Sequence, residues 1–261
     1  MLYDEHILEV INLSKNFGGL VAVNNCSLKI KKKSITGIIG PNGSGKSTLF
    51  NLISGTIKPS SGKVIFNKEN ITGFPPFKLF NKGILRTFQI PQEFTNLTVL
   101  ENLMMVPPSQ SGESLTNALF NRKKFLIEEE KIKKKAIEVL DFLNLFDLTN
   151  ELAGNLSGGQ KKLLELGRTM MTDSKVVLLD EVGAGVNRTL LKDLGSAILK
   201  LNKEKGYTFC MIEHDMDFIS RMCNPVIVLS EGSVLFEGTS HEVKNNDLVI
   251  DSYLGRANKK N

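Results

Sequence analysis

Apolar residues in the first third of the chain occur in short runs separated by polar turns, which is the pattern of β-strands. These runs lie at residues 7–13, 26–30 and 34–39. The third run leads into a glycine-rich turn and then into a helix that we expect to begin near Ser47. Apolar residues on both sides of Lys68-Glu69 predict a hairpin. We therefore expect an antiparallel sheet, built from residues 5–35 and 62–72, beside a parallel sheet.

Helical periodicity replaces the strand pattern in the middle of the chain, from about residue 97 to 171. The segment Thr98 to Glu101 has the spacing of a capping box, in which a hydroxyl and a carboxylate satisfy backbone amides at a helix start. Residues 107–121 are rich in Pro, Ser, Gly and Asn and predict a loop. We expect one long helix over 123–146 and a further helix over 157–171.

Strands and helices alternate again in the last third of the chain. We expect strands at 176–180 and 207–212, a helix at 188–204 capped by Asn187, and a last hairpin of residues 226–229 and 234–236. Such alternation predicts an α/β protein with a parallel sheet, which the helical block in the middle of the chain interrupts.

The composition is that of a soluble globular protein, with 41% hydrophobic and 23% charged residues among 261. The net charge of +5 comes from scattered lysines without an arginine-rich or aromatic-interleaved stretch, so we expect no nucleic-acid partner. Three cysteines without metal-ligand spacing are expected to be reduced core residues. No signal segment is recognisable, and every apolar run is far shorter than the ~20 residues of a membrane helix. We therefore expect that the chain does not cross a membrane by itself.

Residues 40–47, Gly-Pro-Asn-Gly-Ser-Gly-Lys-Ser, match the phosphate-loop pattern G-x-x-x-x-G-K-[ST]. Glycines let successive N–H groups point at phosphate oxygens, and the following helix adds its positive end. We expect Lys46 to reach the β and γ phosphates and the Ser47 hydroxyl to ligate Mg²⁺. A purely structural glycine turn is the alternative, and the strand before the loop and the helix after it favour the phosphate loop.

Two adjacent acids end the apolar strand Val176 to Asp180. A carboxylate at the carboxyl end of a core strand is suited to face Mg²⁺, which is the role expected of Asp180. Glu181 follows directly and points in a different direction, so it can face the attacking water. An Asp-Glu pair after a strand, taken alone, is more often part of a solvated turn. Its occurrence in the same chain as a phosphate loop favours the metal-binding and catalytic roles instead.

Three further features point to the same chemistry. Leu156-Ser157-Gly158-Gly159-Gln160 is a second glycine-rich helix start with a capping box, which offers donors to an anion but has no lysine. His214 follows a predicted core strand and lies at its ligand-binding edge, where a γ-phosphate contact is the functional interpretation and a structural histidine the alternative. Gln89 ends an apolar stretch at the border of the helical block, where nucleotide sensing is conceivable.

In this order, these elements resemble the nucleotide-binding subunits of ABC transporters over nearly the whole chain. The resemblance implies a P-loop NTPase with a RecA-like parallel sheet core, an antiparallel β subdomain and an inserted α-helical subdomain. The core and the β subdomain would comprise residues 1–90 and 172–240. The helical subdomain with the signature motif would comprise 91–171, and a C-terminal helix and tail 241–261.

The resemblance also assigns roles to residues, with ATP and Mg²⁺ as cofactors. It implies Walker A at 40–48, the Q-loop at Gln89, the signature at 156–160 and Walker B at 176–180. The catalytic residues would be Glu181, His214 and Lys46. The metal ligands would be Ser47, Gln89 and Asp180. The residue that stacks on adenine would be Phe17. The other nucleotide contacts would be Asn42, Gly43, Ser44, Gly45, Lys46, Ser47, Thr48, Gln89, Ser157, Gly159 and Gln160.

Finer motifs resemble the LivG-type ATPases of branched-chain amino acid importers: Phe17-Gly18-Gly19-Leu20, Arg86-Thr87-Phe88-Gln89, Ile212-Glu213-His214-Asp215-Met216 and Ser252-Tyr253-Leu254-Gly255. The expected partners are a second ATPase subunit, identical or paralogous, in a head-to-tail dimer, integral membrane permease subunits and, indirectly, a solute-binding protein. The expected location is the cytoplasmic face of the cell membrane. The alternatives are a lipopolysaccharide-type export ATPase and a soluble ABC ATPase of an assembly complex.

One position departs from the family pattern. The family usually has proline after the catalytic glutamate, and this chain has Val182. Valine restores a backbone N–H and some freedom to the turn. We expect retained activity with altered coupling.

Overall fold

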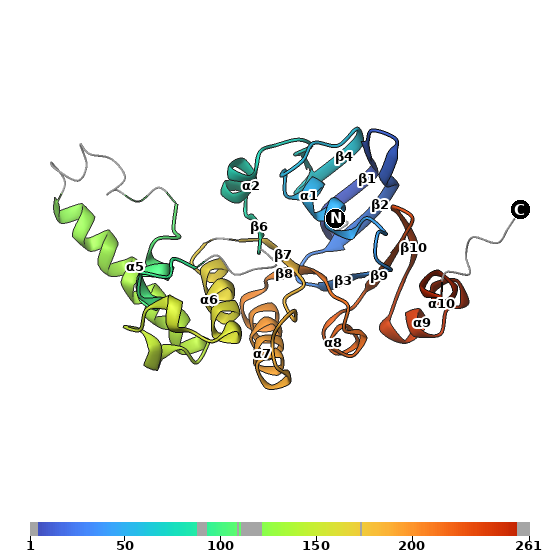
Figure 1. The fold of residues 1–261 in the computed structure, drawn as a ribbon. Coiled ribbons are helices and arrows are strands. Elements are labelled where there is room, and N and C mark those ends of the chain that lie inside the picture. The colour runs from blue at the N-terminus through green and yellow to red at the C-terminus, as the bar shows by residue number, and fades with distance from the viewer. Residues whose placement is uncertain (1–4, 88–92, 109, 111–121, 173, 255–261) are drawn as a thin grey trace, which may run out of the picture. The chain divides into compact units, whose positions relative to one another are not determined.

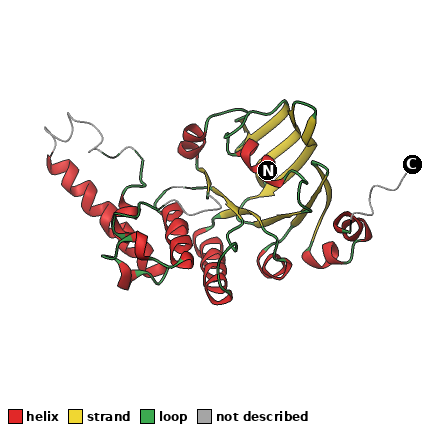
Figure 2. Ribbon diagram, in the orientation of Figure 1, coloured by secondary structure: helices red, strands yellow, loops and turns green. Residues whose placement is uncertain are grey.

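A computed structural model describes residues 5–87, 93–108, 110, 122–172 and 174–254 (Figure 1). The described residues form two compact units. The first contains those of 1–86, 175–184 and 198–261, and the second those of 87–174 and 185–197. The strands of both sheets belong to the first unit, whereas the second is helical (Figure 2).

The first sheet of this unit is antiparallel, with strand order β2-β1-β4-β5. Its strands are β1 (His6–Phe17), β2 (Leu20–Lys31), β4 (Ser61–Phe66) and β5 (Glu69–Asn70). β1 and β2 extend beyond their predicted apolar runs because register shifts interrupt the alternation of apolar and polar residues. Asn67 and Lys68, both with positive φ, make the turn of the predicted hairpin. The antiparallel sheet expected from the sequence is confirmed.

The second sheet has six strands in the order β10-β9-β3-β8-β7-β6. They are β3 (Ile35–Ile39), β6 (Ile84–Arg86), β7 (Val176–Asp180), β8 (Thr208–Ile212), β9 (Val226–Ser230) and β10 (Ser233–Gly238). All neighbouring pairs are parallel except β9–β10, the predicted last hairpin. β6 has only three residues, too few for a recognisable period, and the sequence did not predict it.

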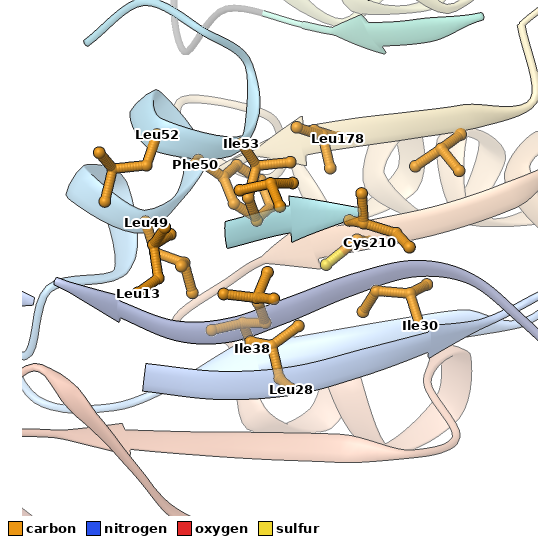
Figure 3. Close-up of a cluster of buried hydrophobic side chains, with 14 of the residues drawn as sticks. Leu13, Leu28, Ile30, Ile38, Leu49, Phe50, Leu52, Ile53, Leu178 and Cys210 are labelled. Atoms are coloured by element: carbon orange, nitrogen blue, oxygen red, sulfur yellow. The ribbon is translucent and has the colours of Figure 1, made fainter. Parts of the chain in front are cut away.

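Helix α1 (Lys46–Ile53) packs against both sheets (Figure 3). Leu49 and Phe50 of this helix are fully buried among Leu13 and Leu28 of the antiparallel sheet and Ile38 of the parallel one. Each such side chain contributes about 1.5–3 kcal/mol through its burial. The core therefore fixes the start of α1 directly beyond the carboxyl end of β3.

The remaining helices of the first unit are short. They are α2 (Pro76–Lys82), α8 (Met216–Met222), α9 (Ser240–Lys244) and α10 (Asp247–Tyr253). Helix α7 (Arg188–Lys205) begins in the second unit and ends in the first, and the Asn187 carboxamide caps it by accepting a bond from Leu190 N–H, as predicted. All three cysteines are buried, as expected for core residues, and burial raises the pKa values of their thiols. None of the described helices combines the length and apolar character needed to span a bilayer.

The second unit contains α3 (Val99–Met104), α5 (Arg122–Phe142), α6 (Gly158–Met170) and two 3-10 turns, η2 (Phe146–Leu148) and η3 (Ala153–Asn155). The capping box of Thr98 and Glu101 is present at the start of α3. The prediction of one helix over 123–146 was wrong at its end. Asn144 adopts a left-handed conformation (φ 55°), which stops an α-helix, and the chain then turns into η2.

Candidate active site

The loop between β3 and α1 fits tightly against neighbouring backbone. Gly40 has φ 152°, and a Cβ on it would lie 2.2 Å from the Leu229 carbonyl oxygen. Gly45 has φ 96°, and its Cβ would lie 2.4 Å from the Ala22 carbonyl oxygen. Only glycine fits at either position, because any Cβ would overlap backbone atoms that cannot move aside. The glycine spacing therefore matches the geometry of this loop.

Lys46 is the buried cation of the loop, with 6% of the residue exposed. Its Nζ donates hydrogen bonds to the carbonyl oxygens of Gly40 (2.8 Å) and Pro41 (3.0 Å). Burial lowers the pKa of the Lys46 ammonium, and the carboxylates of Glu181 and Asp180 oppose that shift. The ammonium is thus held inside the loop, near two carboxylates.

A cavity of about 320 Å³ lies over this loop. It is lined by residues 42–48, by Leu20, Val21 and Ala22 of β2, and by Glu181 and His214. The Ser44 hydroxyl belongs to this lining, is buried, and has no hydrogen-bond partner among the described residues. An unpaired buried hydroxyl beside backbone amides and an ammonium is suited to an anionic ligand. The structure thus brings the predicted phosphate-loop residues, Glu181 and His214 to one cavity.

The last residue of β7, Asp180, and the residue after it, Glu181, point to different partners. The Asp180 carboxylate accepts a hydrogen bond from the Arg86 guanidinium at 2.7 Å. The Glu181 carboxylate lies 2.9 Å from Nε2 of His214. Glu181 has φ 48°, a left-handed conformation that costs a non-glycine residue on the order of 1–3 kcal/mol. The structure thus separates the two carboxylates as the sequence predicted.

The end of β8 holds the turn that contains Glu181. The Glu181 N–H donates to the Ile212 carbonyl at 3.0 Å, and the Gly183 N–H donates to Oε1 of Glu213 at 2.8 Å. Glu213 and Val182 are both buried. Together with the His214 contact, these bonds fix the strained turn from the neighbouring strand, although residue 182 is not proline.

The glycine-rich start of α6 belongs to the second unit. Ser157 Oγ accepts a bond from Gln160 N–H, and Gln160 Oε1 accepts one from Ser157 N–H at 2.9 Å. The predicted capping box is confirmed. Ser157 and Gly158 are exposed, Gly159 is buried, and none of the residues at this helix start lines the cavity.

Two other predicted contacts have less support. Phe17 lies at the end of β1 with 48% of its surface exposed, and the Lys15 ammonium is 5.1 Å from its ring centroid. It does not line the cavity, so its stacking role stays a prediction. Gln89 lies outside the described residues.

The sequence did not single out three residues that contact the site. Arg86 pairs with Asp180, and Glu213 binds the turn after Glu181. Burial raises the pKa of the Tyr253 phenol, while a hydrogen bond with the Gly40 backbone opposes the shift. No local pattern in the sequence indicated these contacts, because the partners of the three residues lie far away along the chain. The only hint was that all three residues occur in motifs that resemble LivG-type chains.

Comparison with known proteins agrees with this geometry. The sequence profile of the ABC transporter family matches residues 23–184. The chain is 43% identical over 249 residues to an Archaeoglobus fulgidus protein named "Probable branched-chain amino acid transport ATP-binding protein LivG", with 95% of both chains covered. It is 38% identical to the Pseudomonas aeruginosa protein named "High-affinity branched-chain amino acid transport ATP-binding protein BraF", with 96% of this chain and 98% of that protein covered.

Solved structures show the same fold. The ADP conformation of MJ1267, an ATP-binding cassette of an ABC transporter, superimposes with a TM-score of 0.81 at 40% identity and covers 96% of this chain and 99% of its own. A dimeric post-hydrolysis state of the cassette MJ0796 with ADP and Pi superimposes with a TM-score of 0.71 at 25% identity, covering 90% and 99%. The glycine loop, the carboxylates at the end of β7 and the family match over most of the chain lead to one conclusion: this chain belongs to the ABC transporter family and is an ATP-binding cassette, an ATPase with a P-loop α/β fold.

Proposed function

We propose that this chain powers an ABC importer for branched-chain amino acids or related small solutes. The observation that carries the ATPase part is the cavity that joins Lys46 to the Glu181–His214 pair. The importer part is supported by the names of the relatives, which match this chain over 95% or more of its length. The solute itself is expected to be selected by a binding protein and a permease, because this cavity is suited to phosphates.

The residues beside the loop fit Mg²⁺. Ser47 supplies a hydroxyl oxygen, and Asp180 supplies a buried carboxylate at the end of β7. No cluster of three or more His, Cys, Asp or Glu side chains suited to a metal occurs among the described residues. Two hard oxygen donors without a full protein cage are the arrangement that suits Mg²⁺ bound mainly by phosphates and water. Ser47 and Asp180 would hold the ion, which when bound neutralises phosphate charge; the proposed third ligand, Gln89, lies outside the described residues.

Hydrolysis is proposed to depend on positioning and charge. The Lys46 ammonium and the loop amides stabilise charge on the β and γ phosphates, with further contacts from Asn42 and Thr48. The Glu181 carboxylate accepts the proton of the attacking water, and its bond to His214 orients it. Because the turn is held by β8, the carboxylate is placed before the substrate arrives.

The exposed start of α6 is proposed to complete the site of a second subunit. Ser157, Gly159 and Gln160 offer donors at a helix N-terminus but lack a cation. A head-to-tail pair, with residues 91–171 as a helical subdomain, would place this segment over the nucleotide held by the partner. The dimeric MJ0796 relative supports pairing as the active arrangement.

We expect that mixing two inactive variants restores ATP hydrolysis. Lys46→Met removes the ammonium that is proposed to bind the phosphates. Ser157→Asp keeps a side-chain acceptor at the N-cap of α6 but places a negative charge where the γ-phosphate bound by the partner subunit would lie. Each variant alone should hydrolyse ATP poorly. An equimolar mixture should recover activity, because each heterodimer has one intact composite site. This is measured by phosphate release.

The control for this mixture is Thr239→Asp, which changes the N-cap of α9 in the same way and should leave activity unchanged. If the mixture stays as inactive as its components while Thr239→Asp is active, the two motifs do not act on one shared site. A heterodimer with a paralogue is then tested by repeating the mixture with that subunit.

The importer itself is proposed to sit on the cytoplasmic face of the membrane through its permease. Affinity purification of the tagged chain from membranes should yield integral permease subunits. Proteoliposomes of that complex with its solute-binding protein should take up labelled leucine in an ATP-dependent way. Co-purification of soluble assembly proteins alone would favour the assembly ATPase, and outward lipid transfer would favour the exporter; either would overturn the importer proposal.

A further inference from the structure

Arg86 contacts the predicted metal-facing carboxylate from the neighbouring strand. Its Nη2 donates to Oδ2 of Asp180 at 2.7 Å, and the side chains of the two residues are 15% and 9% exposed. Its Nη1 donates to Oδ1 of Asn51 at 2.5 Å and to Ser54 Oγ at 3.3 Å. One guanidinium thus bridges the end of β7 to α1.

The register of the sheet explains this placement. Arg86 pairs with Leu178 in the parallel β6–β7 ladder, so it lies on the same face as Leu178 and Asp180. That face is the one that α1 covers, because Leu178 belongs to the core cluster with α1. Helix α1 begins at Lys46 and Ser47, so the guanidinium links the carboxylate to the helix that carries the loop lysine and hydroxyl.

This bridge is not explained by stability alone. A buried ion pair costs several kcal/mol of desolvation for each charge, and an apolar pair of similar volume is often as stable. In addition, Arg86 Nε is buried without a hydrogen-bond partner among the described residues. Because burying the Arg86 guanidinium costs desolvation free energy, its place beside a proposed metal ligand points to a role in orienting that ligand.

We propose that Arg86 is a positioning residue for Asp180. By binding Oδ2, the guanidinium sets the rotation of the carboxylate and leaves Oδ1 as the oxygen that would hold the metal of the nucleotide. By binding Asn51, it holds Asp180 at a constant distance from the helix that carries Ser47. This inference rests on the proposed ATPase function and extends it to a residue that does not itself touch the nucleotide.

The test compares ATP affinity with and without Mg²⁺ in the full-length chain. Arg86→Lys keeps the charge but loses the two-armed geometry, and Arg86→Met keeps the length without charge or donors. For both, we expect ATP binding in EDTA to match the wild type. The gain in affinity on adding Mg²⁺ should shrink by about 10-fold or more, as is typical when a residue behind a metal ligand is removed. Binding is followed by displacement of a fluorescent ATP analogue.

Arg221→Met is the matched control, since this arginine is exposed on α8 and donates only to a carbonyl of its own helix among the bonds that the structure records. It should keep the full Mg²⁺ effect. If Arg86→Met does not fold, Arg86→Lys and Asn51→Ala decide, because Asn51→Ala removes only one arm and should reduce the Mg²⁺ effect less.

Two results would overturn the inference. One is an unchanged Mg²⁺ effect in a folded Arg86 variant, even if its melting temperature falls, because that would make the bridge purely structural. The other is an equal loss of affinity with and without Mg²⁺. Failure of the wild type to bind ATP would instead overturn the proposed function, so the two failures are distinguishable.

Discussion

Glu181→Gln is expected to lower ATP hydrolysis by about 100-fold or more, while ATP binding persists. Glutamine keeps the size of the side chain and can still contact His214, but it cannot accept the proton of the attacking water. The left-handed turn at residue 181 is held by a backbone bond to Ile212 of β8 and by the Glu213 side chain, so the substitution should leave the fold unchanged. We propose that ATP binding joins the two subunits and that hydrolysis separates them. The variant should therefore accumulate as an ATP-bound dimer.

Phosphate release and light scattering in saturating ATP measure these two effects. Glu204→Gln removes a carboxylate exposed on α7 and should behave like the wild type. A Glu181→Gln protein that stays monomeric in ATP would count against the dimer, and one that retains hydrolysis would remove Glu181 from the mechanism.

Lys46→Met is expected to weaken ATP binding by about 30- to 150-fold, because charge-assisted bonds to phosphate contribute about 2–3 kcal/mol. The same variant should unfold at the same temperature as the wild type, or at a higher one, in the absence of nucleotide. Lys46 is a buried cation, and methionine fills a similar volume without the cost of burying a charge. Loss of binding without loss of stability would separate a ligand-binding role from a structural one.

Thermal unfolding with and without Mg-ATP measures both properties in one experiment. The melting temperature of the wild type should rise with nucleotide, and that of Lys46→Met should rise much less at the same nucleotide concentration. Lys63→Met, which replaces an exposed lysine of β4, should keep the gain. A normal nucleotide-induced shift in Lys46→Met would contradict the assignment of the loop.

Local features of the chain were predictable because their partners are near in sequence. The capping boxes at Thr98 and Ser157 and the cap at Asn187 each depend on residues three positions away. The start of α1 and the strands of the parallel core other than β6 followed from apolar runs and the glycine loop. Prediction failed where a single residue overrode periodicity, as the left-handed Asn144 did at the end of α5.

The phosphate loop, the two acids after residue 179 and the glycine-rich start of α6 were determined by the sequence alone, since the chemistry of each depends on consecutive residues. Only the tertiary structure decided how they are supported. Arg86 reaches Asp180 across 94 positions, and Glu213 reaches Gly183 across 30. Those contacts arise from the order β8-β7-β6 and its register, and no local pattern encodes which strands become neighbours. The sequence therefore predicted which groups act on ATP, and strand pairing determined which residues contact and support those groups.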